Sequence, residues 1–303
     1  MSKNCIACGS FDIEDSIVSK NDDYSVEGFK SKLCLRCGTN YIFPRPSKSE
    51  INEFYSVKDS NDHKHTDSSL NYYLNKKRAS ERRRDFLAPL LQVKPDGKLL
   101  DFGASTGWFV KMAQDVGYDA HGIDVMKRNV EVGRDRLGLT TLAVGDEDSI
   151  PTSATYDIIT ANNTIEHLID PLEFLIRCKN ALNENGYICL AYPDAGSFMY
   201  RYLKEYSYYY MPPYHLTHFT EDGIEYILKR AGFDSVLQYQ HYEGYYFGHG
   251  LAHKIGLMNS YKKWRNDPDF VQFDIAIDEA IAALAREAGS SLNRTIIARK
   301  RSA

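Results

Sequence analysis

The chain has 303 residues, of which 43% are hydrophobic and 26% charged, and its formal net charge is −4. This length and composition exclude a disordered chain and allow one large domain or two smaller ones. The negative charge argues against a nucleic-acid partner, because such binding depends on clustered Lys and Arg. The N-terminal sequence lacks the pattern of a signal peptide and no run of 18 apolar residues occurs, so we expect a soluble, cytoplasmic protein without a membrane span.

Four cysteines form two close pairs near the start of the chain. Cys5 and Cys8, then Cys34 and Cys37, each have the spacing C-x2-C and are followed by glycine. Two such pairs can supply four thiolates to a tetrahedral zinc ion. No open position suggests a catalytic metal there, so we predict a structural zinc ribbon in residues 1–46. Free or redox-active thiols are the alternative.

Helical patterns follow the ribbon in residues 47–97. Ser47 and Glu50 form a capping box that begins one helix. Apolar periodicity in residues 70–93 predicts one or two amphipathic helices. We expect this region to be a helical linker or lid.

Short apolar runs alternate with helical patterns from Lys98 onward. Such βαβ repetition predicts an α/β fold with a Rossmann-like, mostly parallel sheet and helices on both faces. The first strands are expected at 99–102, 120–125, 140–144, 156–161 and 187–192, with helices at 108–117, 126–137 and 171–183. Further along we expect a helix from 220 to 232, a strand at 234–242, a helix at 276–288 and a strand at 294–301. This domain would cover 98–303, with an aromatic insert at 194–219 and a helical insert at 243–292.

A glycine loop follows the first of these strands and opens a helix. It contains Asp101, Gly103 and Gly107, and glycines there let a ligand approach the backbone at a positively polarised helix N-terminus. The spacing G-x3-G differs from the G-x-G-x-x-G of dinucleotide sites. The loop therefore disfavours a nicotinamide cofactor.

Polar residues also end each of the next three strands. Asp124 ends the second strand, where a carboxylate can bind both hydroxyls of a ribose. Asp146 and Glu147 follow the third strand, where a carboxylate can accept a hydrogen bond from an adenine amino group. Asn162 follows the fourth. One polar group at each successive strand end predicts a single ligand site at this edge of the sheet.

The motifs DFGASTG, HGIDV, VGDEDSIP, YDIITANNTIEHLIDP and NENGYICLAYP, from Lys98 to Pro193, resemble the class I S-adenosylmethionine-dependent methyltransferases in order and spacing. The terminal ARKR segment suits their seventh, antiparallel strand, so the resemblance implies a seven-stranded sheet. The ribbon, the Pro-Arg-Pro junction and the motif PPYHLTHFT resemble bacterial small-molecule methyltransferases that modify sugars and polysaccharides. The implied cofactor is S-adenosylmethionine, beside a structural zinc.

The resemblance also implies roles for individual residues. Asp101 would orient the amino group of the cofactor, Asp124 would hold the ribose, and Asp146 with Glu147 would frame adenine. Ser105 stands where the family often has a glycine. The complete set of implied cofactor residues is Asp101, Gly103, Ala104, Ser105, Gly107, Asp124, Val125, Asp146, Glu147 and Asn162.

Three histidines are candidates for a general base. Transfer to a hydroxyl requires loss of its proton, and histidine is suited to that task by its pKa. The candidates are His167, His215 and His218. We favour methylation of oxygen over carbon or nitrogen, on a sugar, a nucleotide-sugar or a polysaccharide precursor. The aromatic insert is interpreted as a tyrosine-rich lid over this acceptor, with close packing or an oligomer interface as the alternative.

Other functions stay open at this point. An RNA methyltransferase acting on rRNA bases would use the ribbon to hold RNA. An NAD-dependent dehydrogenase has a similar fold, and a binding protein with an inactive cofactor site is a third possibility. The charge argues against the first and the loop spacing against the second.

Overall fold

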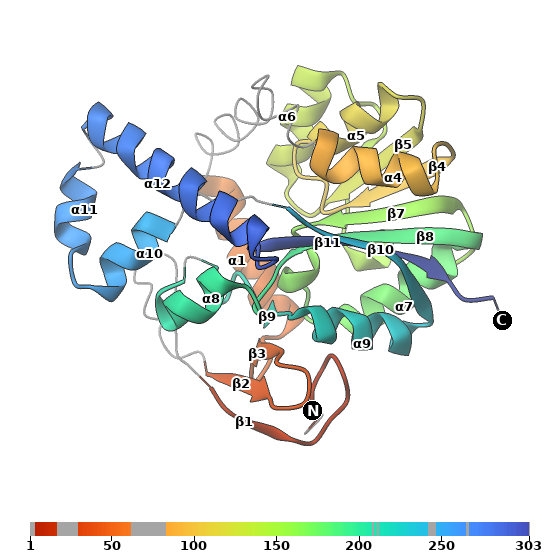
Figure 1. The fold of residues 1–303 in the computed structure, drawn as a ribbon. Coiled ribbons are helices and arrows are strands. Elements are labelled where there is room, and N and C mark those ends of the chain that lie inside the picture. The colour runs from red at the N-terminus through yellow and green to blue at the C-terminus, as the bar shows by residue number, and fades with distance from the viewer. Residues whose placement is uncertain are drawn as a thin grey trace.

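The computed structural model describes residues 4–16, 30–61, 83–207, 209–210, 212–241, 247–264 and 267–302. Within these residues the strands form one seven-stranded and one four-stranded sheet (Figure 1). The helical pattern expected over 70–82 lies outside the described residues, as does the end of the strand expected at 242.

The seven-stranded sheet has the order β10-β11-β8-β7-β4-β5-β6. The four pairings from β8 to β6 are parallel, whereas β11 runs antiparallel to both of its neighbours. The predicted Rossmann-like, mostly parallel sheet with an antiparallel seventh strand is confirmed. Its strands are β4 (Lys98–Phe102), β5 (Asp119–Asp124), β6 (Leu142–Val144), β7 (Tyr156–Asn162), β8 (Leu182–Pro193), β10 (Phe233–His241) and β11 (Asn293–Lys300).

Helices cover both faces of this sheet (Figure 1). Successive side chains of a strand point to opposite faces, so Leu99 and Ile158 join one core cluster while Leu100 and Ile159 join the other. On one side lie η1 (Arg83–Leu87), α4 (Ala88–Val93), α5 (Trp108–Gln114) and α6 (Lys127–Leu137), and on the other α7 (Pro171–Ala181) and α9 (Glu221–Ala231).

Two of the predicted helix caps form as expected. In the capping box before α1 (Lys48–Asn61), the Ser47 amide donates to Glu50 Oε2 at 2.8 Å and the Glu50 amide donates to Ser47 Oγ at 3.3 Å. Thr220 Oγ1 accepts from a backbone amide at the start of α9, and α9 ends at Gly232 in the left-handed region. These local signals place both helices within one residue of the expected starts.

The four-stranded sheet joins distant parts of the sequence. Its first three strands are β1 (Ile13–Asp15), β2 (Ser31–Cys34) and β3 (Asn40–Ile42), and its fourth is β9 (Thr217–His218). Every pairing in it is antiparallel. The expected ribbon is therefore completed by a strand from the aromatic insert.

The ribbon also shares a hydrophobic core with the large sheet. Cys5, Cys34 and Cys37 belong to the same buried cluster as Phe219 and the apolar side of α9. From α9, Arg230 Nη1 donates to the carbonyls of ribbon residues 6 and 7 at 2.8 and 2.6 Å. Whether residue 46 is a domain boundary stays a prediction, but the two parts are packed as one body.

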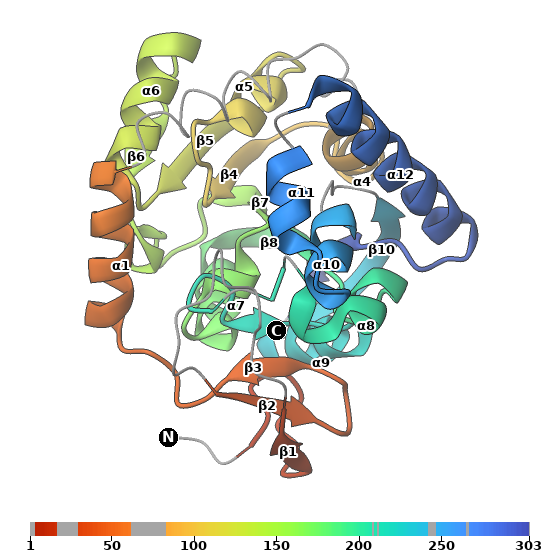
Figure 2. The ribbon, with the colours of Figure 1, turned by 90° about the vertical axis from the view of Figure 1, so that its left-hand side faces the viewer.

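The remaining helices lie to one side of the large sheet (Figures 1 and 2). They are α8 (Phe198–Leu203), η4 (Lys204–Tyr206), α10 (Phe247–Lys254), α11 (Met258–Trp264) and α12 (Pro268–Glu287), and two short turns, η2 (Glu147–Ser149) and η3 (Ile165–His167), follow β6 and β7. The helix expected at 276–288 is the second half of α12. No helix in the described part of the chain is long and apolar enough to span a bilayer.

The close contact between α9 and the ribbon generates a prediction. A Cβ added at Gly223 would overlap with Oγ1 of the fully buried Thr39. We expect Gly223→Ala to lower the free energy of unfolding by about 1–3 kcal/mol, the usual cost of overpacking. Denaturant unfolding measures it, with Lys229→Ala on the exposed side of α9 as the control. Equal stability of the two variants would contradict this packing.

Candidate cofactor and acceptor site

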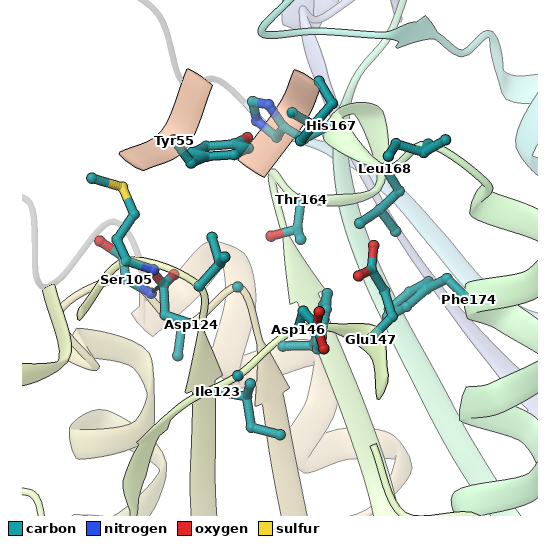
Figure 3. Close-up of a pocket in the computed structure, with 18 of the residues that line it drawn as sticks. Tyr55, Ser105, Ile123, Asp124, Asp146, Glu147, Thr164, His167, Leu168 and Phe174 are labelled. Carbon is teal, nitrogen blue, oxygen red and sulfur yellow. Dashed lines mark hydrogen bonds between the residues drawn. The ribbon is translucent and has the colours of Figure 1, made fainter. Parts of the chain in front are cut away.

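A cavity of about 580 Å³ opens at the carboxyl edge of β4, β5 and β7 (Figure 3). Open α/β sheets bind ligands at this edge, because the loops that follow the strands meet there. The cavity is large enough to hold a small ligand. Helix α1 forms its outer wall and lies beside β6 (Figure 2).

Nine of the ten predicted cofactor residues line this cavity. The exception is Gly107, whose added Cβ would instead meet Leu139 and Leu142. Its φ of 75° lets the chain turn into α5, so its role is in packing and in the start of the helix. The nine that line the cavity are Asp101, Gly103, Ala104, Ser105, Asp124, Val125, Asp146, Glu147 and Asn162.

Asp101 is a buried carboxyl group at the base of the cavity. It accepts hydrogen bonds from Thr160 Oγ1 at 2.6 Å and from Asn162 Nδ2 at 3.3 Å. Burial raises its pKa to about 7, and the nearby Asp124 carboxylate adds to this effect. The Asn162 Oδ1 atom is also buried and has no hydrogen-bond partner among the described residues. A cationic amino group would satisfy both groups, so these residues fit the amino-acid end of the predicted cofactor.

Asp124 holds the glycine loop in shape. Its Oδ2 accepts from the Ser105 amide at 2.7 Å and its Oδ1 accepts from the Met126 amide at 2.9 Å. Ser105 has a φ of 51°, in the left-handed region where glycine is favoured, and the bond to Asp124 secures that conformation. A carboxylate can accept more than two hydrogen bonds, so this arrangement is compatible with a bound ribose.

Helix α1 contributes residues to the cavity that the sequence did not single out. Lys48 Nζ lies 2.9 Å from Asp146 Oδ2 and 2.6 Å from Asp148 Oδ2. Tyr55 extends over the cavity from the same helix (Figure 3). The signal for Tyr55 was its place on the apolar side of the helical pattern, which indicated burial but not against which surface.

The four predicted metal ligands come together in the ribbon. The sulfur atoms of Cys5, Cys8, Cys34 and Cys37 all lie within 4.8 Å of one another. The Cys5 and Cys37 sulfurs are 3.7 Å apart, and those of Cys8 and Cys34 are 3.5 Å apart. A zinc ion about 2.3 Å from four sulfurs in a tetrahedron requires separations of about 3.8 Å. The geometry of the four thiols therefore fits zinc.

The three predicted catalytic histidines form one cluster, but only His167 lines the cavity. The ring centroids of His167 and His215 are 4.6 Å apart, and those of His215 and His218 are 6.1 Å apart. His218 is 4% exposed and burial lowers its pKa to about 3, so it is a neutral interior residue. In this arrangement His167 can contact a ligand in the cavity directly, whereas His215 and His218 cannot.

Glu166 is a buried acid in this cluster that sequence reasoning missed. It is 2% exposed, and neither carboxylate oxygen has a hydrogen-bond partner among the described residues. Burial raises its pKa to about 8. The sequence indicates a role for its neighbour His167, because a histidine can act as a general base. A glutamate inside a polar motif carries no signal of burial.

Two tyrosines of the aromatic insert do not form part of the expected lid. Tyr200 and Tyr210 are buried inside the fold, and the Tyr210 hydroxyl donates to a serine of β2 at 2.6 Å. Among the described tyrosines of the insert, Tyr214 lines the cavity. Tyrosine supplies a large apolar ring with a polar tip, which suits the packing that joins the insert to the ribbon.

The sequence profile of a family described as a methyltransferase domain matches residues 73–238, more than half of the chain. The chain belongs to this family. With the Rossmann-like sheet and its cavity, this makes it an S-adenosylmethionine-dependent methyltransferase. The dehydrogenase alternative is thereby removed.

Curated relatives of this methyltransferase match a shorter stretch. A ubiquinone biosynthesis O-methyltransferase of Cereibacter sphaeroides is 31% identical over 122 residues, which cover 38% of this chain and 47% of that protein. An uncharacterized methyltransferase of Alkaliphilus oremlandii is 28% identical over 103 residues, or 33% of this chain and 48% of that one. The chain thus spans about half the length of the curated relatives it matches.

Solved structures show the same fold at low identity. A methyltransferase of Thermotoga maritima, described as a possible histamine N-methyltransferase, superposes with a TM-score of 0.51 at 17% identity, covering 82% of this chain and all of that one. The [4+2]-cyclase SpnF superposes with a TM-score of 0.54 at 17% identity, covering 86% and 98% of the two chains. These likenesses support the fold alone.

The buried carboxyl group of Asp101 generates a pH prediction. Its pKa of about 7 lies above the ordinary 3.8, so the folded chain binds more protons than the unfolded chain between pH 4 and 7. On this account the free energy of unfolding falls as pH rises through that window, by up to about 4 kcal/mol. Asp101→Asn should remove this decrease and gain stability relative to the natural protein at pH 8. Unfolding curves of both proteins from pH 4 to 8 measure the difference, and a constant difference would contradict it.

Proposed function

We propose that this methyltransferase transfers a methyl group from S-adenosylmethionine to a hydroxyl group of a small, sugar-like acceptor. The observation that carries the proposal is the placement of one histidine, His167, in the wall of the cavity that also contains Asp101 and Asp124. The acids proposed for the cofactor and a histidine side chain thus line one cavity.

The proposed cofactor contacts follow the geometry of the cavity. When bound, S-adenosylmethionine supplies a methyl group activated by a sulfonium. Asp101 and Asn162 would accept hydrogen bonds from its amino group, because both present acceptor oxygens at a buried site. Asp124 would accept from the ribose, and Asp146 with Glu147 would border adenine. Tyr55 covers this space and would exclude water from it.

Two observations support an oxygen acceptor. The curated relatives that match the chain include O-methyltransferases, which agrees with the preference for oxygen over carbon or nitrogen. Transfer to a hydroxyl forms an O–C bond, breaks the S–C bond with its electron pair left on sulfur, and releases the hydroxyl proton. The cluster around His167 is the part of the cavity wall suited to assist that proton's departure.

A sugar-like acceptor is supported by the polarity of the cavity wall. Beyond the residues assigned to the cofactor, the wall includes Asp170, which caps α7, and Glu173 and Arg177 within that helix. Such groups can donate to and accept from an acceptor with several hydroxyls. The RNA alternative is disfavoured by the net charge of −4, because RNA binding depends on clustered Lys and Arg. An oligomer formed through the aromatic insert stays a prediction.

The function is tested by measuring methyl transfer directly. Purified protein should convert S-adenosylmethionine to S-adenosylhomocysteine in the presence of nucleotide-sugars or small glycans, with mass spectrometry locating the new methyl group on oxygen. Asp124→Ala should weaken cofactor binding by at least about tenfold in calorimetry, because the carboxylate both shapes the loop and contacts the ribose. Asp119→Ala, an exposed acid at the far end of the same strand, is the control. Unchanged affinity in Asp124→Ala would refute the cofactor assignment.

We also propose that the four cysteines bind one structural zinc ion. Buried thiols as close as those of Cys5 and Cys37 repel one another once ionised, and a dication relieves that repulsion. The cluster presents four protein ligands and therefore leaves no position for a substrate.

Metal analysis tests the zinc proposal. The natural protein should contain about one zinc per chain, and Cys37→Ala should lose it together with much of its stability, because Cys37 lies in the shared core. Cys178→Ala, another buried cysteine, should retain zinc. Zinc-free protein of unchanged stability would count against the assignment.

A further inference from the structure

Glu166, His167 and His215 form a second group of candidate metal ligands. One ligand atom from each of the three side chains lies within 4.8 Å of the others. Glu166 and His167 belong to η3 at the end of β7, whereas His215 precedes β9. The group is separate in sequence from the four cysteines and stands at the wall of the cavity, which His167 lines.

A cationic partner would stabilise the buried carboxylate of Glu166. Both of its oxygens are buried and have no hydrogen-bond partner among the described residues, and the nearest imidazole nitrogen, His167 Nε2, is 4.0 Å away. A buried carboxylate without such a partner costs several kcal/mol. Either a proton or a metal cation removes that cost. The two imidazoles beside the carboxylate favour the metal cation, because a proton needs no further ligands.

Both imidazoles are oriented in the way that metal ligands usually are. His167 Nδ1 donates to the Tyr214 carbonyl and His215 Nδ1 donates to the Tyr209 carbonyl, each at 2.8 Å. These bonds place the proton on Nδ1 and leave Nε2 as the nitrogen with the lone pair. Donation of the second ring nitrogen to a carbonyl is the common outer contact of metal-bound histidine.

The backbone around the group is held on both sides. The Leu216 amide donates to the Glu166 carbonyl at 2.8 Å, and the Ile42 amide of β3 donates to the Leu216 carbonyl at 2.9 Å. The half-buried Arg45 donates to the Leu168 carbonyl at 3.2 Å and to Thr217 Oγ1 at 2.7 Å. A group fixed this firmly keeps its three side chains close before any ion binds.

We infer that Glu166, His167 and His215 bind a divalent first-row transition-metal ion that coordinates the oxygen of the methyl acceptor. The inference rests on the proposed function. Two imidazoles and one carboxylate suit such ions and leave coordination positions open. Metal–ligand distances of about 2.0–2.2 Å require the side chains to move inward by about 1 Å.

The chemistry that the ion adds concerns the acceptor hydroxyl. A coordinated hydroxyl ionises more readily, so its proton passes to water while the oxygen stays bound to the ion. The oxygen then attacks the methyl carbon, and the electron pair of the S–C bond stays on sulfur. His167 and His215 would act as ligands in this arrangement, and Glu166 would supply the negative charge that retains the ion.

The test uses Mn²⁺ and the full-length protein with one zinc per chain, so that zinc fills the cysteine site and not the second group. Mn²⁺ binds nitrogen and oxygen ligands and does not displace zinc from thiolates, so the ribbon stays intact. Electron paramagnetic resonance of free Mn²⁺ should show about one tight site per chain. Glu166→Gln, which keeps the shape of the side chain, and His215→Gln should each weaken binding by about tenfold or more. His121→Gln, which removes an imidazole 3.0 Å from Asp119 on β5, is the matched control and should retain the site.

The affinity for S-adenosylmethionine, measured by calorimetry without Mn²⁺, separates the two proposals. Full cofactor affinity in Glu166→Gln shows that this variant is folded. If Glu166→Gln does not fold, His215→Gln takes its place in the Mn²⁺ measurement. Natural protein that binds the cofactor but takes up no Mn²⁺, or Glu166→Gln that binds Mn²⁺ as the natural protein does, overturns the metal site alone. Natural protein that does not bind the cofactor overturns the proposed function.

Discussion

The backbone of Leu216 connects the parts of this molecule that lie far apart in the sequence. Its amide donates to the Glu166 carbonyl after β7, and its carbonyl accepts from the Ile42 amide of β3 and from the Arg45 guanidinium. The segment that carries His215 and His218 is therefore a strand between the ribbon and the cavity wall. Without β3 this segment would have no partner for β9, so the ribbon supports the wall of the cavity near His167.

The connection through Leu216 requires the charged guanidinium of Arg45 to lose part of its contact with water. Burial lowers the pKa of its guanidinium to about 10, yet its hydrogen bonds go to carbonyl groups and a threonine hydroxyl rather than to a carboxylate. A buried charge is tolerated only when its donors are satisfied, and five donors in a rigid plane can bridge several backbone segments at once. Lysine would carry the charge but could not span these acceptors.

Much of the fold and most of the residues that line the cavity could be predicted, because those signals are local. Alternating apolar runs, caps such as Thr220 and a glycine loop after the first strand depend on neighbouring residues, and nine of ten predicted cofactor residues line one cavity. The remaining positions depend on long-range packing. Gly107 supports a helix, and Tyr200 and Tyr210 fill space between the insert and the ribbon, because aromatic composition does not reveal which surface a ring will meet.

The fold alone does not determine the acceptor side of this methyltransferase. The fold is shared with proteins of different chemistry, including a [4+2]-cyclase, so the sheet and the cofactor loop do not determine what reacts. The groups on the acceptor side are placed by tertiary contacts: a buried glutamate whose carboxylate has no hydrogen-bond partner among the described residues, two imidazoles fixed by carbonyls, and a ribbon that holds their backbone. A buried acid of this kind lowers stability, and such a cost persists where the group has a task, which is why Glu166 rather than the tyrosines directs attention to the acceptor.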